Sequence, residues 1–219
     1  MTKSARNVCH TRILVFAKAP IPGMVKTRLI PTLGAQRAAE LQTALIYHTL
    51  ATTAQSGLKV ELWCYPDGKH PLFLTCARKF AIVLRTQKGA DLGARMYHAV
   101  KMALAAGPAI LIGTDCPTLT AEELRETSMR LERGSDAVLG PALDGGYYLL
   151  GLNRIHPSLF EDISWGSNRV LAETRRRLRI LDWQWRETPA RRDVDRPGDL
   201  ACLPSALAGV IDGFFGNHP

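Results

Sequence analysis

Two uninterrupted apolar runs constrain the fold of this 219-residue chain more than any other feature. Residues 13–17 read Ile-Leu-Val-Phe-Ala, and residues 109–112 read Ala-Ile-Leu-Ile. Runs of this length without a polar residue are typical of strands that are buried on both faces, as in parallel sheets covered by helices. The sequence therefore predicts an α/β fold.

Segments of strand and helix character alternate through the first two thirds of the chain, which is the pattern of a mainly parallel sheet with helices on both faces. Further strands are expected over 60–65, 82–84, 137–139 and 147–150, and a late strand is expected to present Leu181, Trp183 and Trp185 on one face. Helices are expected over 34–56, from Pro71, and over 92–106, 120–134 and 167–178, and 193–207 is expected to be a loop that leads to a closing helix. With no repeat and no break in composition, we expect one domain over residues 1–219.

The charge balance favours an anionic ligand. The chain has 28 Lys and Arg against 20 Asp and Glu, a net charge of +8, and phosphate-bearing small molecules and nucleic acid both fit this excess. The five cysteines include no CxxC pair, so the sequence indicates neither a disulfide framework nor a zinc site. The first dozen residues are polar and basic, and the apolar run behind them ends at Lys18. Because that run is too short for a signal sequence or a membrane span, we expect a cytoplasmic protein.

A loop with three cations follows the first predicted strand. Its sequence from Lys18 to Arg28 is KAPIPGMVKTR, and ligands of parallel sheets bind at the carboxyl ends of the strands. It is not a Walker A loop, because Gly23 lies only three residues before Lys26 and the prolines remove amides that would bind phosphate. The loop is either a nucleotide site in which cations bind phosphate or a solvated surface loop.

Acidic residues follow the later strands. Asp115 stands in Gly-Thr-Asp-Cys-Pro directly after the second apolar run, where a carboxylate can bind a cation that bridges to phosphate or can form a turn. Asp144 precedes two glycines, which allow a tight turn or a close approach to a ligand. The segment Asp193-Val-Asp-Arg-Pro-Gly-Asp199 holds three acids, and Asp195 or Asp199 could also begin the last helix.

Several other features carry no catalytic signature. The six histidines include no HExxH motif, and no GxSxG sequence is present, so neither a zinc protease nor a serine hydrolase is indicated. The arginines at 175–177 and 179 lie on a predicted helix, where such a run is usually a solvated face. We therefore do not expect nucleic acid to be the partner.

Four ordered motifs together carry a resemblance to a known family. They are FAKAPIPGMVKTRL, LIGTDCPTL, GPALDGGYYLLGL and DVDRPGDL, and they lie between residues 12 and 203. The set resembles a small bacterial family of glycosyltransferase-A-like proteins in the nucleotide-diphospho-sugar transferase superfamily. The resemblance implies the α/β fold of that superfamily.

The resemblance also implies roles for individual residues. A divalent cation, Mg²⁺ or Mn²⁺, would be held by Asp115 and Asp195, which we expect to converge at the carboxyl edge of the sheet opposite the cationic loop. Asp144 would lie near the acceptor or the sugar and take part in catalysis with Lys26 and Arg28. The residues implied to bind the nucleotide and substrate are Lys18, Ala19, Pro20, Gly23, Lys26, Arg28, Gly145 and Gly146.

Two departures from the superfamily leave the reaction open. Glycosyltransferases of this fold commonly carry an Asp-x-Asp pair, but here Gly113 stands two residues before Asp115. Nucleotidyltransferases usually carry a glycine-rich loop, whereas this loop contains prolines. The leading expectation is a metal-dependent transferase that uses a nucleotide sugar and an unknown acceptor. The alternatives are nucleotidyl transfer from a nucleoside triphosphate to a small phosphorylated acceptor, and a non-catalytic protein that binds nucleotide or RNA.

Overall fold

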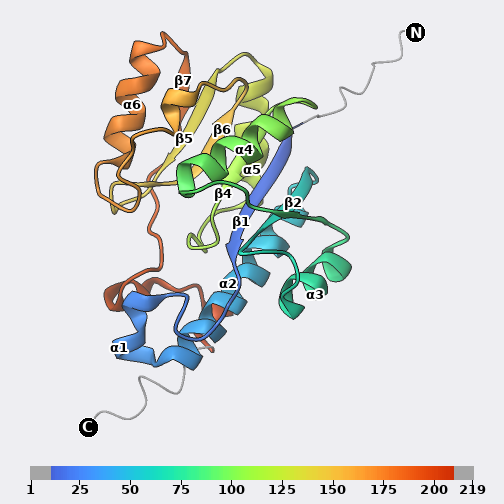
Figure 1. The fold of residues 1–219 in the computed structure, drawn as a ribbon, viewed down its shortest axis with the longest axis vertical. Coiled ribbons are helices and arrows are strands. Elements are labelled where there is room, and N and C mark those ends of the chain that lie inside the picture. The colour runs from blue at the N-terminus through green and yellow to red at the C-terminus, as the bar shows by residue number, and fades with distance from the viewer. Residues whose placement is uncertain (1–10, 210–219) are drawn as a thin grey trace.

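A seven-stranded sheet runs through residues 11–209, the part of the chain that the computed structural model describes (Figure 1). The strand order is β3-β2-β1-β4-β6-β5-β7. Strand β6 pairs antiparallel with both of its neighbours, and the other adjacent strands pair in parallel. The strands are β1 (Arg12–Lys18), β2 (Lys59–Tyr65), β3 (Val83–Thr86), β4 (Ala109–Ile112), β5 (Ala137–Pro141), β6 (Tyr147–Leu152) and β7 (Trp185–Glu187).

Helices cover both faces of the sheet, and the alternation within β1 shows how. Ile13, Val15 and Ala17 contribute to a core with α2 (Ala35–Gln55), α3 (Pro71–Phe80) and α5 (Ala121–Glu132). Leu14 contributes to the core on the opposite face, with α4 (Leu92–Leu104) and α6 (Val170–Ile180). Because side chains of a strand alternate between faces, a strand between two cores must be apolar throughout. The predicted fold class, a mainly parallel sheet with helices on both faces, is confirmed.

Side chains cap the first turns of α5 and α4. Thr120 accepts a hydrogen bond from the backbone N–H of Glu123 at 3.2 Å, and Asp91 accepts one from Ala94 at 2.8 Å. Each cap satisfies one of the amides that the first turn of a helix leaves without an internal partner. The cap of α4 helps to fix the end of that helix that faces the site described below.

The late strand is shorter than predicted. Strand β7 begins only at Trp185, and the chain before it turns at Asp182, whose φ of 53° is left-handed. Trp183 is buried because it packs in the core beside α6, and its backbone N–H donates to Leu178 at 3.0 Å. The prediction that Leu181, Trp183 and Trp185 share one face of a strand was therefore wrong. The structure also adds a 3₁₀ turn, Thr27–Leu29, at the end of the predicted loop 18–28. A short helix α1 (Ile30–Leu33) lies between that loop and the helix predicted from residue 34, where the sequence predicted no element.

A third core cluster fastens the end of the chain to its beginning. Val194, Leu200 and Leu207 pack with Leu29, Leu33, Leu41 and Leu45. The chain descends from β7 to reach α1 and the adjoining part of α2, where it forms a 3₁₀ segment (Pro197–Cys202) and α7 (Ser205–Ala208) (Figure 1). The acids at 193–195 are thereby held beside the loop that follows β1.

None of the helices within residues 11–209 combines the length and the apolar character needed to cross a bilayer.

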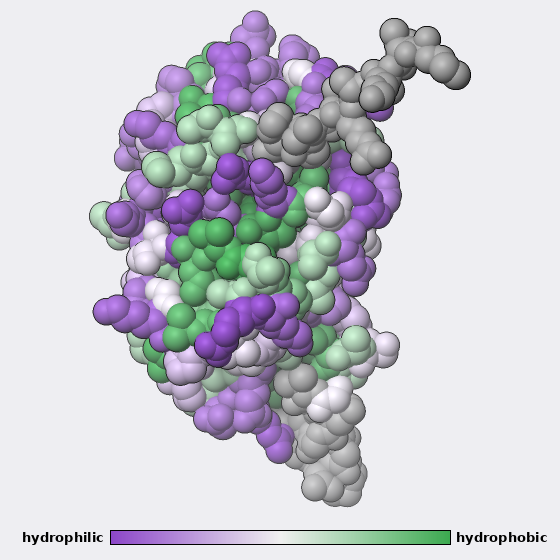
Figure 2. Space-filling model, turned by 90° about the vertical axis from the view of Figure 1, so that its right-hand side faces the viewer, coloured by the Kyte–Doolittle hydropathy of each residue, from purple (hydrophilic) through white to green (hydrophobic). Residues whose placement is uncertain are grey.

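The side of the molecule that carries α3 and the edge strand β3 shows an apolar area bordered by hydrophilic side chains (Figure 2). Most of the polar, basic leading segment singled out in the sequence, and the predicted domain limits at 1 and 219, lie outside the described residues.

Candidate active site

The strand order creates a crevice at the centre of the sheet. Strands β1 and β4 are neighbours, but the chain continues from β1 to β2 on one side and from β4 toward β5 and β6 on the other. Where connections diverge in this way, the carboxyl ends of the strands open into a ligand-binding crevice. Here the loop 18–28 after β1 and the turn 113–115 after β4 line a cavity of about 610 Å³.

The loop after β1 is held by its own backbone and by Lys18. The Lys18 Nζ donates to the carbonyl of Met24 at 2.6 Å, and Gly23 makes the turn with a φ of 82°, which favours glycine. Ala19 and Pro20, the second and third residues of the loop, are buried. The Ala19 N–H donates to the Tyr65 carbonyl at 2.8 Å. These contacts fix the backbone of the loop, and the fixed backbone holds the cationic side chains in defined positions.

Lys26 joins three distant segments at the floor of the cavity. Its side chain is only 2% exposed, and Nζ lies 2.7 Å from Oδ1 of Asp115 and 2.6 Å from the carbonyl oxygen of Val194. Lys26 also has a left-handed backbone with φ of 47°, which costs energy in a residue with a side chain. Such strain persists only where the surrounding contacts over-determine it, and the two contacts of Nζ do so here.

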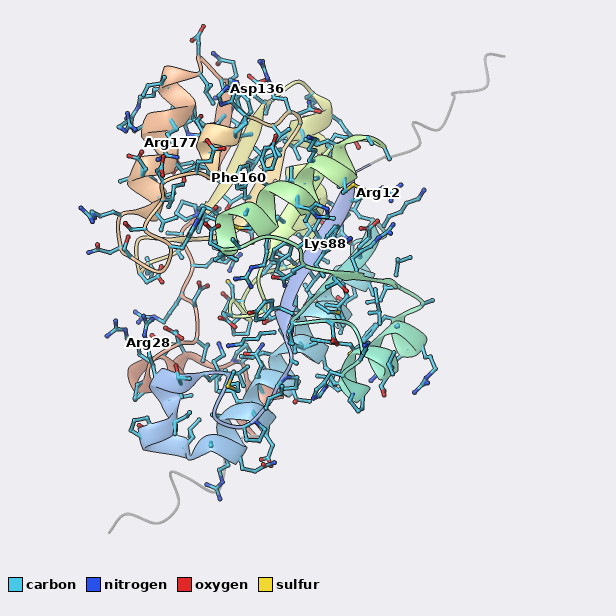
Figure 3. The ribbon with its side chains drawn as sticks, in the orientation of Figure 1. Arg12, Arg28, Lys88, Asp136, Phe160 and Arg177 are labelled. Carbon is cyan, nitrogen blue, oxygen red and sulfur yellow. The ribbon has the colours of Figure 1, made fainter. Side chains whose placement is uncertain are left out.

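Arg28 makes the second ion pair of the site, with Asp195. Figure 3 shows Arg28 at the end of the loop, beside the segment that descends from β7. The two expected metal ligands, Asp115 and Asp195, thus lie opposite the cationic loop, and both line the cavity. The Val194 N–H donates to the Asp115 carbonyl at 2.7 Å, which ties the turn after β4 to the late acidic segment.

A second cavity of about 320 Å³ adjoins the first. The two share a boundary formed by Phe16, Arg28, Leu92, Gly113, Asp115 and Asp195. Beyond this boundary, aromatic and aliphatic side chains from β4, β6, α4 and the 165–170 segment form most of the lining. The crevice is therefore one site with two compartments.

The compartments differ in charge. Among the described residues that line them, the first cavity has four cationic and two acidic side chains, and the second has one cationic and four acidic. The cations of the first are Lys18, Lys26, Arg28 and Arg95. The acids of the second are Asp115, Asp144, Asp193 and Asp195. A phosphate-bearing ligand is favoured in the first cavity and disfavoured in the second.

Asp193 is a site residue that the sequence reasoning passed over. Its Oδ1 is buried, and within the described part of the chain this oxygen has no hydrogen-bond partner. Burial, then the charges of Asp115 and Asp144, raise the pKa of the Asp193 carboxyl to about 7, although Lys26 acts in the opposite direction. The sequence feature that could have indicated Asp193 is the alternation Asp-Val-Asp at 193–195. Val194 packs into the third core cluster, and in an extended segment its two acidic neighbours then face away from that cluster.

The remaining predicted site residues lie in the second compartment or support it. Asp144 and Gly146 line the second cavity, and the Asp144 carboxylate accepts the Gly146 N–H at 2.9 Å, so Asp144 makes a turn as well. Gly145 has a φ of 90°, and a Cβ there would overlap the backbone of Asn168. Gly145 therefore allows a close approach to the backbone of Asn168, which is part of the protein, rather than to a ligand.

The site was tested for a divalent cation through its donor chemistry. In residues 11–209, no group of three or more His, Cys, Asp or Glu side chains is arranged to hold a metal ion. The ion pairs use Oδ1 of Asp115 and Oδ2 of Asp195, which leaves one oxygen of each carboxylate outside the pairs. Carboxylate oxygens suit Mg²⁺, and Oδ1 of Asp193, in the same acidic segment as Asp195, is a further oxygen that the described residues leave without a partner. The type of these oxygen donors suits such a cation, although the described residues form no ready-made site, and binding of a cation by Asp115 and Asp195 stays a prediction.

The fold and this two-compartment crevice define an α/β protein of the nucleotidyltransferase and glycosyltransferase-A-like architecture. The chain belongs to the family described as "Uncharacterized protein conserved in bacteria (DUF2064)", whose model matches residues 49–167. A search of curated proteins gives no significant match.

Solved structures share the fold over nearly the whole chain. A protein from Desulfovibrio desulfuricans G20, provisionally assigned as a nucleotide-diphospho-sugar transferase, is 28% identical, with a TM-score of 0.82 over 94% of this chain and 96% of that one. A cytidylyltransferase from Leptospira borgpetersenii is 15% identical, with a TM-score of 0.54 over 96% and 98%. An inositol-1-phosphate CTP transferase from T. maritima is 12% identical, with a TM-score of 0.56 over 96% and 98%. The last two show likeness of fold alone.

Proposed function

We propose that this protein is a divalent-cation-dependent transferase that takes its donor from a nucleotide sugar. The observation that carries the proposal is the pair of adjoining, oppositely charged cavities at the carboxyl edge of β1 and β4. A transferase needs one compartment for a phosphate-bearing donor and another for the acceptor, with the reacting atoms at their boundary. The likeness to a nucleotide-diphospho-sugar transferase over nearly the whole chain supports the same donor class.

In the proposed complex, the first cavity binds the donor. Its cations carry the charge that diphosphate oxygens require, and charge-assisted hydrogen bonds to phosphate are about twice as strong as neutral ones. Lys26, at the floor of this cavity, and Arg28, at the boundary between the two cavities, would bind the oxygens of the leaving diphosphate. A divalent cation held by Asp115 and Asp195 would neutralise charge that develops on those oxygens.

The reaction joins the acceptor to the sugar. An acceptor hydroxyl oxygen forms a bond to the anomeric carbon, the bond from that carbon to the diphosphate oxygen breaks, and the nucleoside diphosphate leaves. The hydroxyl proton passes to a carboxylate, and Asp144, which lines the acceptor compartment outside both ion pairs, is the residue proposed to take it.

Product analysis tests this proposal directly. The full chain is incubated with nucleoside triphosphates or nucleotide sugars and a mixture of sugars, polyols and sugar phosphates as acceptors. Each incubation is run with Mg²⁺, with Mn²⁺ and with a chelator, and the products are measured by mass spectrometry. Release of a nucleoside diphosphate that depends on the cation is the expected result. Release of pyrophosphate from a triphosphate would instead assign nucleotidyl transfer. If no nucleotide is bound or consumed while single-stranded RNA binds, the protein is not a transferase of this kind.

A further inference from the structure

The second cavity carries information about the acceptor, and the inference rests on the proposed function. We infer that the acceptor is an uncharged, ring-shaped polyol that carries no phosphate group. Two properties of the cavity lead to this class of molecule. They are an apolar corner that fits the C–H face of a ring, and carboxylates that accept hydrogen bonds from hydroxyl groups but repel an anion.

The apolar corner is formed by Tyr147 and Trp165. Their ring centroids lie 6.5 Å apart and the ring planes meet at 87°, so the two side chains form adjacent walls. Met96, Phe16 and Leu92 extend the apolar surface around them. Aromatic walls of this kind supply a large apolar contact area with defined geometry, which suits a flat ring rather than a flexible chain.

Tyr147 adds little hydrogen bonding of its own to this corner. Its hydroxyl lies 3.9 Å from the thioether sulfur of Met96, a weak acceptor, and burial raises the pKa of this phenol. The phenol therefore stays neutral, and the wall remains apolar. Polar recognition of the ring must come from other residues that line the cavity.

Carboxylates supply that recognition. Asp144 and Asp193 line the second cavity and not the first, and Oδ1 of Asp193 is a buried acceptor without a partner among the described residues. A hydroxyl group of a bound polyol would satisfy this oxygen, and leaving such an atom unsatisfied is costly. A carboxylate only accepts hydrogen bonds when ionised, so the complementary groups on the ligand are donors.

The same carboxylates oppose a phosphorylated acceptor. The only cation among the described lining residues of this cavity is Arg28, and its guanidinium is already paired with Asp195. A phosphate group in this compartment would face Asp144 and Asp193, two acids for which the described residues provide no ion-pair partner, without a free cationic side chain. Like charges placed together at a binding site are a recognised means of rejecting a competing ligand.

A binding comparison tests the inference. The protein is first loaded with a nucleoside diphosphate and Mg²⁺ and then titrated by calorimetry with myo-inositol, glucose and mannose and with the monophosphate of each. The expected result is that the uncharged ring binds at least about tenfold more tightly than its monophosphate. The D144N/D193N double variant keeps the shape of the cavity and removes both carboxyl groups that lie outside the ion pairs, so this preference is expected to fall roughly tenfold or more. E126Q removes one surface charge outside the cavities and is the control that should leave the preference unchanged.

The possible outcomes separate this inference from the function on which it rests. Failure of the nucleoside diphosphate to bind would refute the proposed donor site, and the acceptor inference with it. If the nucleotide binds but a monophosphate binds as tightly as its uncharged ring, or no ring binds, the acceptor inference alone is wrong. W165F keeps an aromatic wall and serves as a second check, since it should bind the rings while W165L binds them about tenfold more weakly.

Discussion

Lys26 offers the sharpest test of how this site is held together. The substitution Lys26→Met keeps the apolar stem of the side chain but removes the charge, the ion pair with Asp115 and the hydrogen bond to the Val194 carbonyl. A hydrogen bond from a charged group contributes about 1.5–3 kcal/mol, and an orphaned buried acceptor costs about 1–3 kcal/mol. Breaking a fully buried ion pair costs about 3–5 kcal/mol, but Asp115 is 45% exposed, so water takes over part of its solvation.

We therefore expect Lys26→Met to lower the free energy of unfolding by about 2–4 kcal/mol, a large share of the stability of an ordinary domain. Urea unfolding at pH 7, followed by tryptophan fluorescence, measures the change, and the slope of the transition should stay the same. Lys18→Met is the matched control from the same loop. Lys18 is exposed and makes one hydrogen bond to Met24, so its loss should cost less than about 1 kcal/mol.

A double-mutant cycle then separates the two contacts of Lys26. If the unpaired Asp115 charge causes part of the loss, Lys26→Met should be less damaging in an Asp115→Asn background than in the native chain. If Lys26→Met costs no more than Lys18→Met, Lys26 does not join the three segments in solution. The reasoning that derives the shape of the site from this lysine would then be wrong.

Three further predictions concern binding, turnover and pH. Arg28→Ala should weaken nucleotide binding in calorimetry about tenfold to a hundredfold, whereas Arg176→Ala, a similarly exposed and ion-paired arginine on α6, should leave it unchanged. Asp115→Asn should reduce turnover of the donor identified by product analysis on the order of a hundredfold without unfolding the protein, and equal turnover would refute its role. Folding raises the pKa of Asp193 to about 7, so this group should make the native protein less stable as the pH rises from about 4 to 7. When stability is measured in the presence of a chelator, Asp193→Asn should abolish this pH-dependent loss. Burial alone would raise the pKa of Asp199, but its backbone hydrogen bonds outweigh burial and lower it. Ionised Asp199 therefore stabilises the fold, and Asp199→Asn should remove a gain in stability that the native protein shows as the pH rises through the acidic range.

Much of the fold could be predicted because strand burial leaves a local signature. The apolar runs in β1 and β4 and the Thr120 cap lie where the sequence indicated. The late strand was misplaced because Trp183 owes its burial to packing in the core beside α6, not to alternation in a strand. The short helix α1 was missed because four residues cannot display a helical period.

The site was harder to predict because its contacts span the chain. Lys26 and Val194 are 168 positions apart, and no local pattern shows that the lysine ends on that carbonyl. From local sequence, a turn was the better explanation for both Asp115 and Asp144, and Asp144 does form one. The resemblance singled out Asp195, but the role of Asp193 emerges only once Val194 is seen to pack into the third core cluster.

The ion pairs also qualify what the net charge of +8 implied. The excess of cations predicted an anionic ligand, yet two of the four cations that line the first cavity, Lys26 and Arg28, are each paired with an acid. A phosphate that enters alone must compete with Asp115 and Asp195 for these side chains, so simple anions should bind weakly. In the proposed complex, Asp115 and Asp195 would instead hold a divalent cation, and Lys26 and Arg28 would then be left to the phosphate oxygens of the donor. Because coupling between two ligands is reciprocal, nucleotide and cation should each strengthen the binding of the other at this site.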